Sequence, residues 1–195
     1  MQALAVYDSA SIANIQLEHG LLVVAVRTQR AMLRPAVREQ VRIALKQTLA
    51  LLLNCPISEI ELFSQPGQAV RLLKPAQNIG ISISHEPELS LVAINMHGAI
   101  GVDAMATSSI PAHIEIHSLA TDYLGHQTAE EIARLPENQQ SQAFAKRWTE
   151  FEARMKCKGE PITEWSSTRD SQLAGYHCKA LLLPQGYIGS IAYQN

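Results

Sequence analysis

Residues 78–105 read NIGISISHEPELSLVAINMHGAIGVDAM, and this stretch decides the fold. It contains three apolar segments, separated by turn residues at 86–88 and 97–98. Isoleucine recurs at every second position from Ile79 to Ile83, which is the period of a half-buried strand. Strands joined by tight turns pair antiparallel, so the stretch predicts three consecutive strands of an antiparallel sheet.

On the N-terminal side, the residues predict a strand, a helix and a hairpin. The apolar run LLVVAV predicts a buried strand at 21–26. Pro35 suits the first turn of a helix, and apolar residues then recur at helical spacing until Asn54. The segments 58–64 and 69–75, with Pro and Gly between them, predict a hairpin.

On the C-terminal side, helices come first and strands last. Thr128 and Glu131 form a capping-box pattern for a short helix. A long helix is expected to begin at Asn138 or Ser141 and to end at Gly159, the C-cap. Two further apolar runs near the C-terminus predict a closing hairpin.

The order of these elements predicts an α+β fold with two similar halves, residues 1–98 and 99–195, in a pseudo-twofold arrangement. In each half we expect an antiparallel sheet packed against a long helix. No linker of low complexity separates the halves, which meet near His97–Ile100.

Composition indicates a globular chain in the cytoplasm. Of the 195 residues, 47% are apolar and 17% charged, and no apolar run reaches the ~18 residues of a membrane span. The N-terminus lacks a basic segment before an apolar core, so no signal peptide is expected. The three cysteines show no CxxC spacing, which favours reduced thiols. We expect a monomer that does not associate with membranes.

Positive charge is concentrated in one segment of a chain whose net charge is -2. Residues 27–46 hold six basic side chains and one acid, Glu39. Four of the basic residues recur at every fourth position of the first helix: Arg34, Arg38, Arg42 and Lys46. A solvated helix face usually mixes its charges, so the stripe predicts an acidic protein or a phosphate-rich ligand as partner, not nucleic acid.

The stretch WTEFEARMKCKG, residues 148–159, can place a carboxylate and an ammonium at one target. Glu152 and Lys156 lie four apart, on one face of a helix. An ordinary surface ion pair is the simplest interpretation. However, Asp103 ends a predicted strand, and two carboxylates suffice for Mg²⁺ when phosphate and water fill the other positions.

Together these features resemble the 4'-phosphopantetheinyl transferase superfamily, in its monomeric surfactin-type branch. The resemblance runs from about Arg38 to Gly159. The matching residues, in order, are Lys74-Pro75, Ser84-His85, Gly101-Val102-Asp103, and Trp148, Glu152, Ala153 and Lys156.

The resemblance implies transfer of the phosphopantetheine arm of coenzyme A to a serine of an apo acyl or peptidyl carrier protein, with Mg²⁺ as cofactor. Asp103 and Glu152 would bind the metal, Glu152 or water on the metal would deprotonate the serine, and Lys156 would oppose leaving-group charge. The residues implied to hold the phosphates of coenzyme A are Arg38, Lys74, Ser84 and His85.

Two departures from the family pattern support a different hypothesis. Met105 stands where most members have a second acid, and a thioether is a soft donor that suits Mg²⁺ poorly. Phe151 replaces the lysine that precedes the helix glutamate in the family. The alternative is a catalytically impaired relative that binds coenzyme A or a carrier protein as a scaffold. A third hypothesis, a zinc site, rests on three histidines: His113, His117 and His126.

Overall fold

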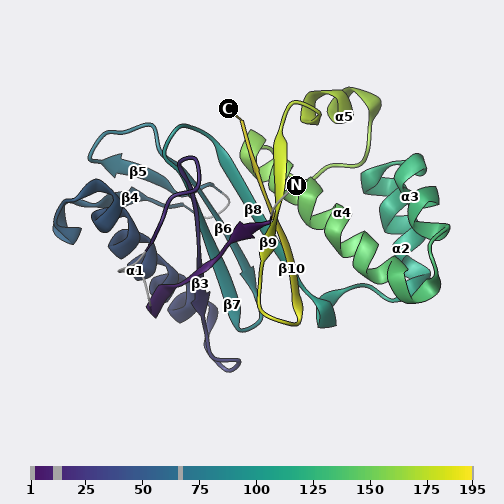
Figure 1. Cartoon of the computed structure of the whole chain (residues 1–195), viewed down its shortest axis with the longest axis horizontal. Coiled ribbons are helices and arrows are strands. Elements are labelled where there is room, and N and C mark those ends of the chain that lie inside the picture. Colours follow the sequence, from purple (N-terminus) through teal and green to yellow (C-terminus); the bar gives the residue numbers. More distant parts are fainter. Residues whose placement is uncertain (1–2, 11–14, 66–67, 195) are drawn as a thin grey trace.

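The computed structural model describes residues 3–10, 15–65 and 68–194. Helix α1 (Arg34–Leu53), two four-stranded sheets and helix α4 (Glu137–Lys158) stack in that order (Figure 1). The predicted α+β class is confirmed, including the packing of α4 on a sheet.

The first sheet has the strand order β2 (Tyr7–Asp8), β3 (Leu21–Arg27), β7 (Leu89–Asn95) and β6 (Gly80–Glu86). β3, β7 and β6 pair antiparallel, whereas the short β2 runs parallel to β3. The strand predicted at 21–26 is therefore confirmed, and so are the first two strands of 78–105.

Helix α1 covers one face of the first sheet. Its apolar side packs through Val41, Leu45 and Leu49 onto a cluster that includes Val24 and Ile94. Pro35 lies in the first turn, and Asn54 in the left-handed conformation (φ 49°) caps the C-terminus, as predicted.

The second sheet has the order β1 (Leu4–Ala5), β9 (His177–Leu182), β10 (Tyr187–Tyr193) and β8 (Ile100–Ala106). The predicted closing hairpin is β9–β10, and β8 pairs antiparallel with β10. The prediction that both sheets are antiparallel is wrong, because β1 runs parallel to β9 and β2 parallel to β3. The N-terminal segment divides between the two sheets and supplies a parallel outer strand to each.

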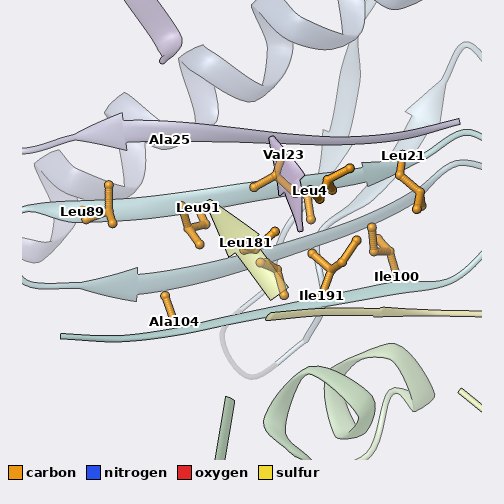
Figure 2. Close-up of a cluster of buried hydrophobic side chains, with 12 residues drawn as sticks. Leu4, Leu21, Val23, Ala25, Leu89, Leu91, Ile100, Ala104, Leu181 and Ile191 are labelled. Carbon is orange, nitrogen blue, oxygen red and sulfur yellow. The ribbon is translucent and has the colours of Figure 1, made fainter. Parts of the chain in front are cut away.

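The main core lies between the two sheets (Figure 2). Leu21 and Leu91 of the first sheet meet Ile100 and Ile191 of the second in this cluster, and Leu181 of β9 joins them. The alternation predicted for 78–105 has its origin in two different surfaces at β6: Ile79, Ile81 and Ile83 pack on the side that α1 covers, whereas the residues between them face β8.

Helix α4 lies against the outer face of the second sheet. It begins at Glu137, one residue before the nearer of the two predicted starts, and ends at Gly159 (φ 77°), as predicted. At Gly101 the strand has no side chain, and a Cβ there would overlap Ala153 O and Cys157 N of the helix. This glycine therefore sets how closely α4 approaches β8.

The remaining helices pack around α4. They are α2 (His113–Leu119), the π-helical turn η4 (Ala120–Leu124), α3 (His126–Ala133) and α5 (Ser167–Leu173). The predicted capping box is wrong: Gly125 is the N-cap of α3, so Thr128 lies inside the helix. Short 3-10 turns lie at Ile57–Glu59 and Thr107–Ser109.

The predicted hairpin of residues 58–75 is present in shortened form. β4 (Glu61–Phe63) pairs antiparallel with β5 (Arg71–Lys74) as a separate two-stranded sheet. Among the described residues, no helix combines the length and apolar character that crossing a membrane requires.

Candidate functional site

The two sheets are joined at their edges by side chains of β6. β8 does not continue the first sheet, although it follows β7 closely in sequence. Three successive outward-directed N–H groups of β8 donate instead to side chains on alternate residues of β6. These bonds are Val102 N to Ser82 Oγ (3.0 Å), Ala104 N to Ser84 Oγ (3.3 Å) and Ala106 N to Glu86 Oε2 (2.8 Å).

Asp103 lies within this seam, on the face of β8 directed at α4. Its side chain is 7% exposed, and Oδ1 accepts hydrogen bonds from Ser84 Oγ at 3.1 Å and from Lys156 Nζ at 2.6 Å. Burial raises the pKa of Asp103 to about 7; Glu152 also raises it, while Lys156 and the Ser84 hydroxyl oppose the rise. The carboxyl can therefore change its protonation state near neutral pH.

Glu152 and Lys156 project from α4 towards Asp103. Lys156 Nζ lies 3.7 Å from Glu152 Oε2 and also donates to Val102 O at 3.2 Å. The other oxygen of Glu152, Oε1, accepts a hydrogen bond from the Trp148 indole at 2.7 Å. One ammonium thus contacts a strand carboxylate and a helix carboxylate, so the three residues predicted to act together do converge.

Aromatic packing holds the Trp148 indole in this position. Its ring lies 5.5 Å from the rings of Tyr123 and Phe144 and 6.1 Å from that of Phe151, measured between centroids. Phe151 is buried, and its ring also lies beneath the guanidinium of Arg169, 4.6 Å from the ring centroid. The Phe151 ring therefore packs between Trp148 and Arg169.

A cleft of about 990 Å³ adjoins this group, a volume at the upper end of the range for small-molecule sites. It lies between α1, the β4–β5 segment, β6 and the C-terminal end of α4. The ionisable groups among its described lining residues are Arg38, Arg42, Arg71, His85, Lys156 and Glu160, of which four are Arg or Lys. Its charge favours an anionic ligand. Of Asp103, Glu152 and Lys156, only Lys156 is among the described residues that line this cleft, and none of the three is among those that line two other cavities, of about 830 and 210 Å³.

The cationic groups of the cleft affect the pKa of His85. Its Nδ1 lies 2.8 Å from Ser90 Oγ, on the face of the first sheet that α1 covers. Burial lowers the pKa of His85 below 6.5, and the charges of Arg38 and Lys156 lower it further. The ring is therefore neutral at pH 7, and a bound anion would favour its protonation.

The predicted phosphate ligands are only partly brought together. Arg38 and His85 share the cleft with Lys156. Lys74 is not among the described residues that line it; its side chain is 72% exposed and pairs with Glu61 at 2.8 Å. Ser84 is buried and bonded within the seam.

Asp103 and Glu152 form a pair of carboxylates that suits a hard cation such as Mg²⁺. Asp103 and Glu152 offer oxygen ligands close enough to contact one ammonium, and Mg²⁺ needs no more than one or two carboxylates. Within the described ranges, no group of three or more His, Cys, Asp and Glu side chains could hold a metal. That finding is against the zinc hypothesis of His113, His117 and His126.

Three features were missed by sequence reasoning: the position of Arg71 in the cleft, the bond between Ser82 and the Val102 N–H, and the bond between Trp148 and Glu152. The Arg71 guanidinium lies 5.0 Å from the Phe63 ring on the paired strand, and no motif marks it. The spacing of Trp148 and Glu152, four residues apart on one helix, was the available signal for their contact.

Neither a scan of protein-family models nor a search of curated proteins found a match for this chain. The assignment of function therefore depends on the residues and geometry of the site itself.

Proposed function

We propose that the protein transfers the 4'-phosphopantetheine arm of coenzyme A to a serine of an apo carrier protein and releases adenosine 3',5'-bisphosphate. The observation that carries the proposal is the contact of Lys156 Nζ with both Asp103 and Glu152 at the wall of a basic cleft. These residues belong to the motifs that resemble 4'-phosphopantetheinyl transferases.

The finer architecture is part of the same proposal. We infer that residues 1–98 and 99–195 are related halves, the first for coenzyme A phosphates and the second for the metal and the chemistry. In support, each four-stranded sheet carries one long helix and a parallel outer strand. β1 departs from a strict division, since Leu4–Ala5 pairs with β9 of the second sheet.

In the proposed reaction, the carrier serine oxygen forms a bond to the phosphorus of the phosphopantetheine arm, and the bond from that phosphorus to the bridging oxygen breaks. Glu152 takes the serine proton, and Trp148 keeps its carboxylate oriented by holding Oε1. Lys156, in the cleft wall, opposes the charge that develops on the leaving phosphate. Asp103 and Glu152 would hold Mg²⁺, which supplies charge stabilisation at the pyrophosphate.

In this proposal the basic stripe is divided between two partners, coenzyme A and the carrier protein. Arg38 and Arg42 line the cleft, whereas Arg34 is exposed at the N-terminal end of α1 and does not line it. We propose that Arg34, with Arg30 before it, meets the acidic surface of the carrier protein.

The direct test is incubation with coenzyme A, Mg²⁺ and several apo carriers, followed by mass spectrometry of each carrier. A carrier that gains the mass of the phosphopantetheine arm supports the proposal. Glu152→Gln should lower the rate by about 10² or more, because the carboxylate acts on a proton in the transition state. Glu150→Gln, on the same helix beside Arg147, is the matched control. If no carrier gains the arm while a known transferase modifies the same samples, the proposal fails.

The scaffold alternative has its own supporting observation. Lys156 Nζ already contacts Asp103, Glu152 and Val102 O, so the carboxylates have an internal cation, and Met105 adds no third acid. Calorimetry separates the two functions. Coenzyme A binding that gains nothing from Mg²⁺, together with no transfer, would favour the scaffold.

A further inference from the structure

We propose that Ser84 is a positioning residue that holds Asp103 for metal binding, and that it is not a ligand of a coenzyme A phosphate. The inference deepens the proposed function and rests on its assignment of Asp103 as a metal ligand. It replaces the role that the sequence motif implied for this serine.

The hydrogen-bonding capacity of Ser84 is used within the protein. A serine hydroxyl has one proton to donate. Ser84 gives it to Asp103 Oδ1 at 3.1 Å, and its oxygen accepts the Ala104 N–H at 3.3 Å. A phosphate oxygen needs a donor, and the Ser84 hydroxyl has no second proton to offer. The residue as a whole is also only 5% exposed, so a ligand in the cleft has little access to it.

The bond determines the orientation of the Asp103 carboxylate. Oδ1 accepts from Ser84 on the β6 side and from Lys156 on the α4 side. Two donors at one oxygen restrict rotation about the bond that carries the carboxylate, so the second oxygen keeps one direction. Hydrogen bonds from residues behind a metal ligand orient it, and their loss typically lowers metal affinity by about 10- to 100-fold.

Ser82 provides a matched control from the same seam. It lies two residues earlier on β6, is also buried, and accepts the Val102 N–H at 3.0 Å. Removing its hydroxyl leaves one β8 N–H without its partner, as removal of the Ser84 hydroxyl does. Val102 is aliphatic, however, so Ser82 has no carboxylate to orient at its partner residue. The difference between the two variants therefore isolates the bond to Asp103.

The experiment is calorimetric titration of the whole 195-residue chain with Mg²⁺. Ser84→Ala should weaken Mg²⁺ binding about tenfold or more. Ser82→Ala should change the Mg²⁺ affinity less than about twofold. Ser84→Thr, which retains the hydroxyl, should preserve most of the Mg²⁺ affinity. Urea unfolding of each variant shows whether both alanine variants lose similar stability. In EDTA, Ser84→Ala should bind coenzyme A as the unsubstituted protein does.

Each contrary result is informative. Equal weakening of Mg²⁺ binding by both alanine variants assigns the seam a structural role only and overturns the inference. A loss of coenzyme A affinity in EDTA specific to Ser84→Ala restores the phosphate role and overturns it as well. So does an unsubstituted protein that binds no Mg²⁺. A protein that binds Mg²⁺ through Ser84 and Asp103 but modifies no carrier leaves this inference standing and removes the proposed function.

Discussion

Replacing Asp103 with asparagine tests the electrostatics of the seam directly. Asparagine keeps the shape of the side chain and an Oδ1 acceptor for Ser84 and Lys156, but it has no group that ionises. The ordinary pKa of this carboxyl is 3.8, and burial raises it to about 7 in the folded protein. The folded protein therefore binds this proton more tightly than the unfolded chain does.

The sign and size of the effect follow from this difference. Below about pH 4 the carboxyl is protonated in both states, and the stabilisation is fully present. As the pH rises to 7, the unfolded chain ionises first and the folded protein loses that stabilisation. At about 1.4 kcal/mol per pH unit, the interval from 3.8 to about 7 is worth up to about 4 kcal/mol. The asparagine variant has no such loss, so its free energy of unfolding relative to the unsubstituted protein should rise across this range.

The assay is urea unfolding of both proteins in EDTA at pH values from 4 to 8, with the difference in free energy plotted against pH. Groups common to both proteins cancel in this difference. The asparagine amide also alters the contact with Lys156, so the quantity compared is the change of this difference with pH and not its absolute value. Glu39→Gln, an exposed substitution on α1, controls for the removal of a carboxylate as such. A flat difference would refute the reasoning, and a difference that falls with rising pH would show that the ion pair with Lys156 outweighs burial.

Three further substitutions test other parts of the structure. Gly101→Ala should destabilise the protein by about 1–3 kcal/mol in urea unfolding, because the added methyl pushes α4 away from β8; Gly175→Ala, where a Cβ meets no atom within 4 Å, is the control. Arg38→Ala should raise the pKa of His85 towards 6.5 in an NMR titration, because the substitution removes a nearby cation. Lys46→Ala on the same helix should leave that pKa unchanged, and an unchanged His85 pKa in Arg38→Ala would contradict the arrangement of the cleft. Arg34→Glu should raise the KM for the carrier protein several-fold, most at low salt, and leave the KM for coenzyme A unchanged; equal changes in both would argue against separate binding surfaces.

Local pattern predicted most of the regular elements. The apolar alternation in 78–105 and the helical spacing after Pro35 describe which faces are buried, and Asn54 and Gly159 carry the left-handed conformations that end α1 and α4. Such features depend on residues close together in the sequence. The start of α3 was misjudged because Gly125 is a weaker N-terminal signal than the capping-box pattern at Thr128.

The sequence predicted that Asp103, Glu152 and Lys156 lie together, but it did not predict which other residues surround them or how the side chains contact one another. The spacing on α4 was enough to place Glu152 and Lys156 on one face, and the motif order indicated that Asp103 acts with them. Nothing local indicated that Ser84 faces Asp103, because that bond crosses between two sheets. The pattern of apolar residues likewise could not show that β8 belongs to the second sheet. A strand whose N–H groups bond to side chains of its neighbour has the same apolar alternation as one whose N–H groups bond to the neighbour's backbone.

The sequence by itself determined the α+β class, the two long helices, the basic stripe and the identity of the charged residues, because each is written in short-range periodicity or composition. Only the tertiary structure decided which of these residues meet. It separated Lys74 from the cleft, brought Arg71 into it, and placed Lys156 between Asp103 and Glu152. The physical reason is that these contacts depend on how the sheets and helices pack, and hydrophobic burial between layers sets that packing without leaving a local signal at the polar residues it brings together.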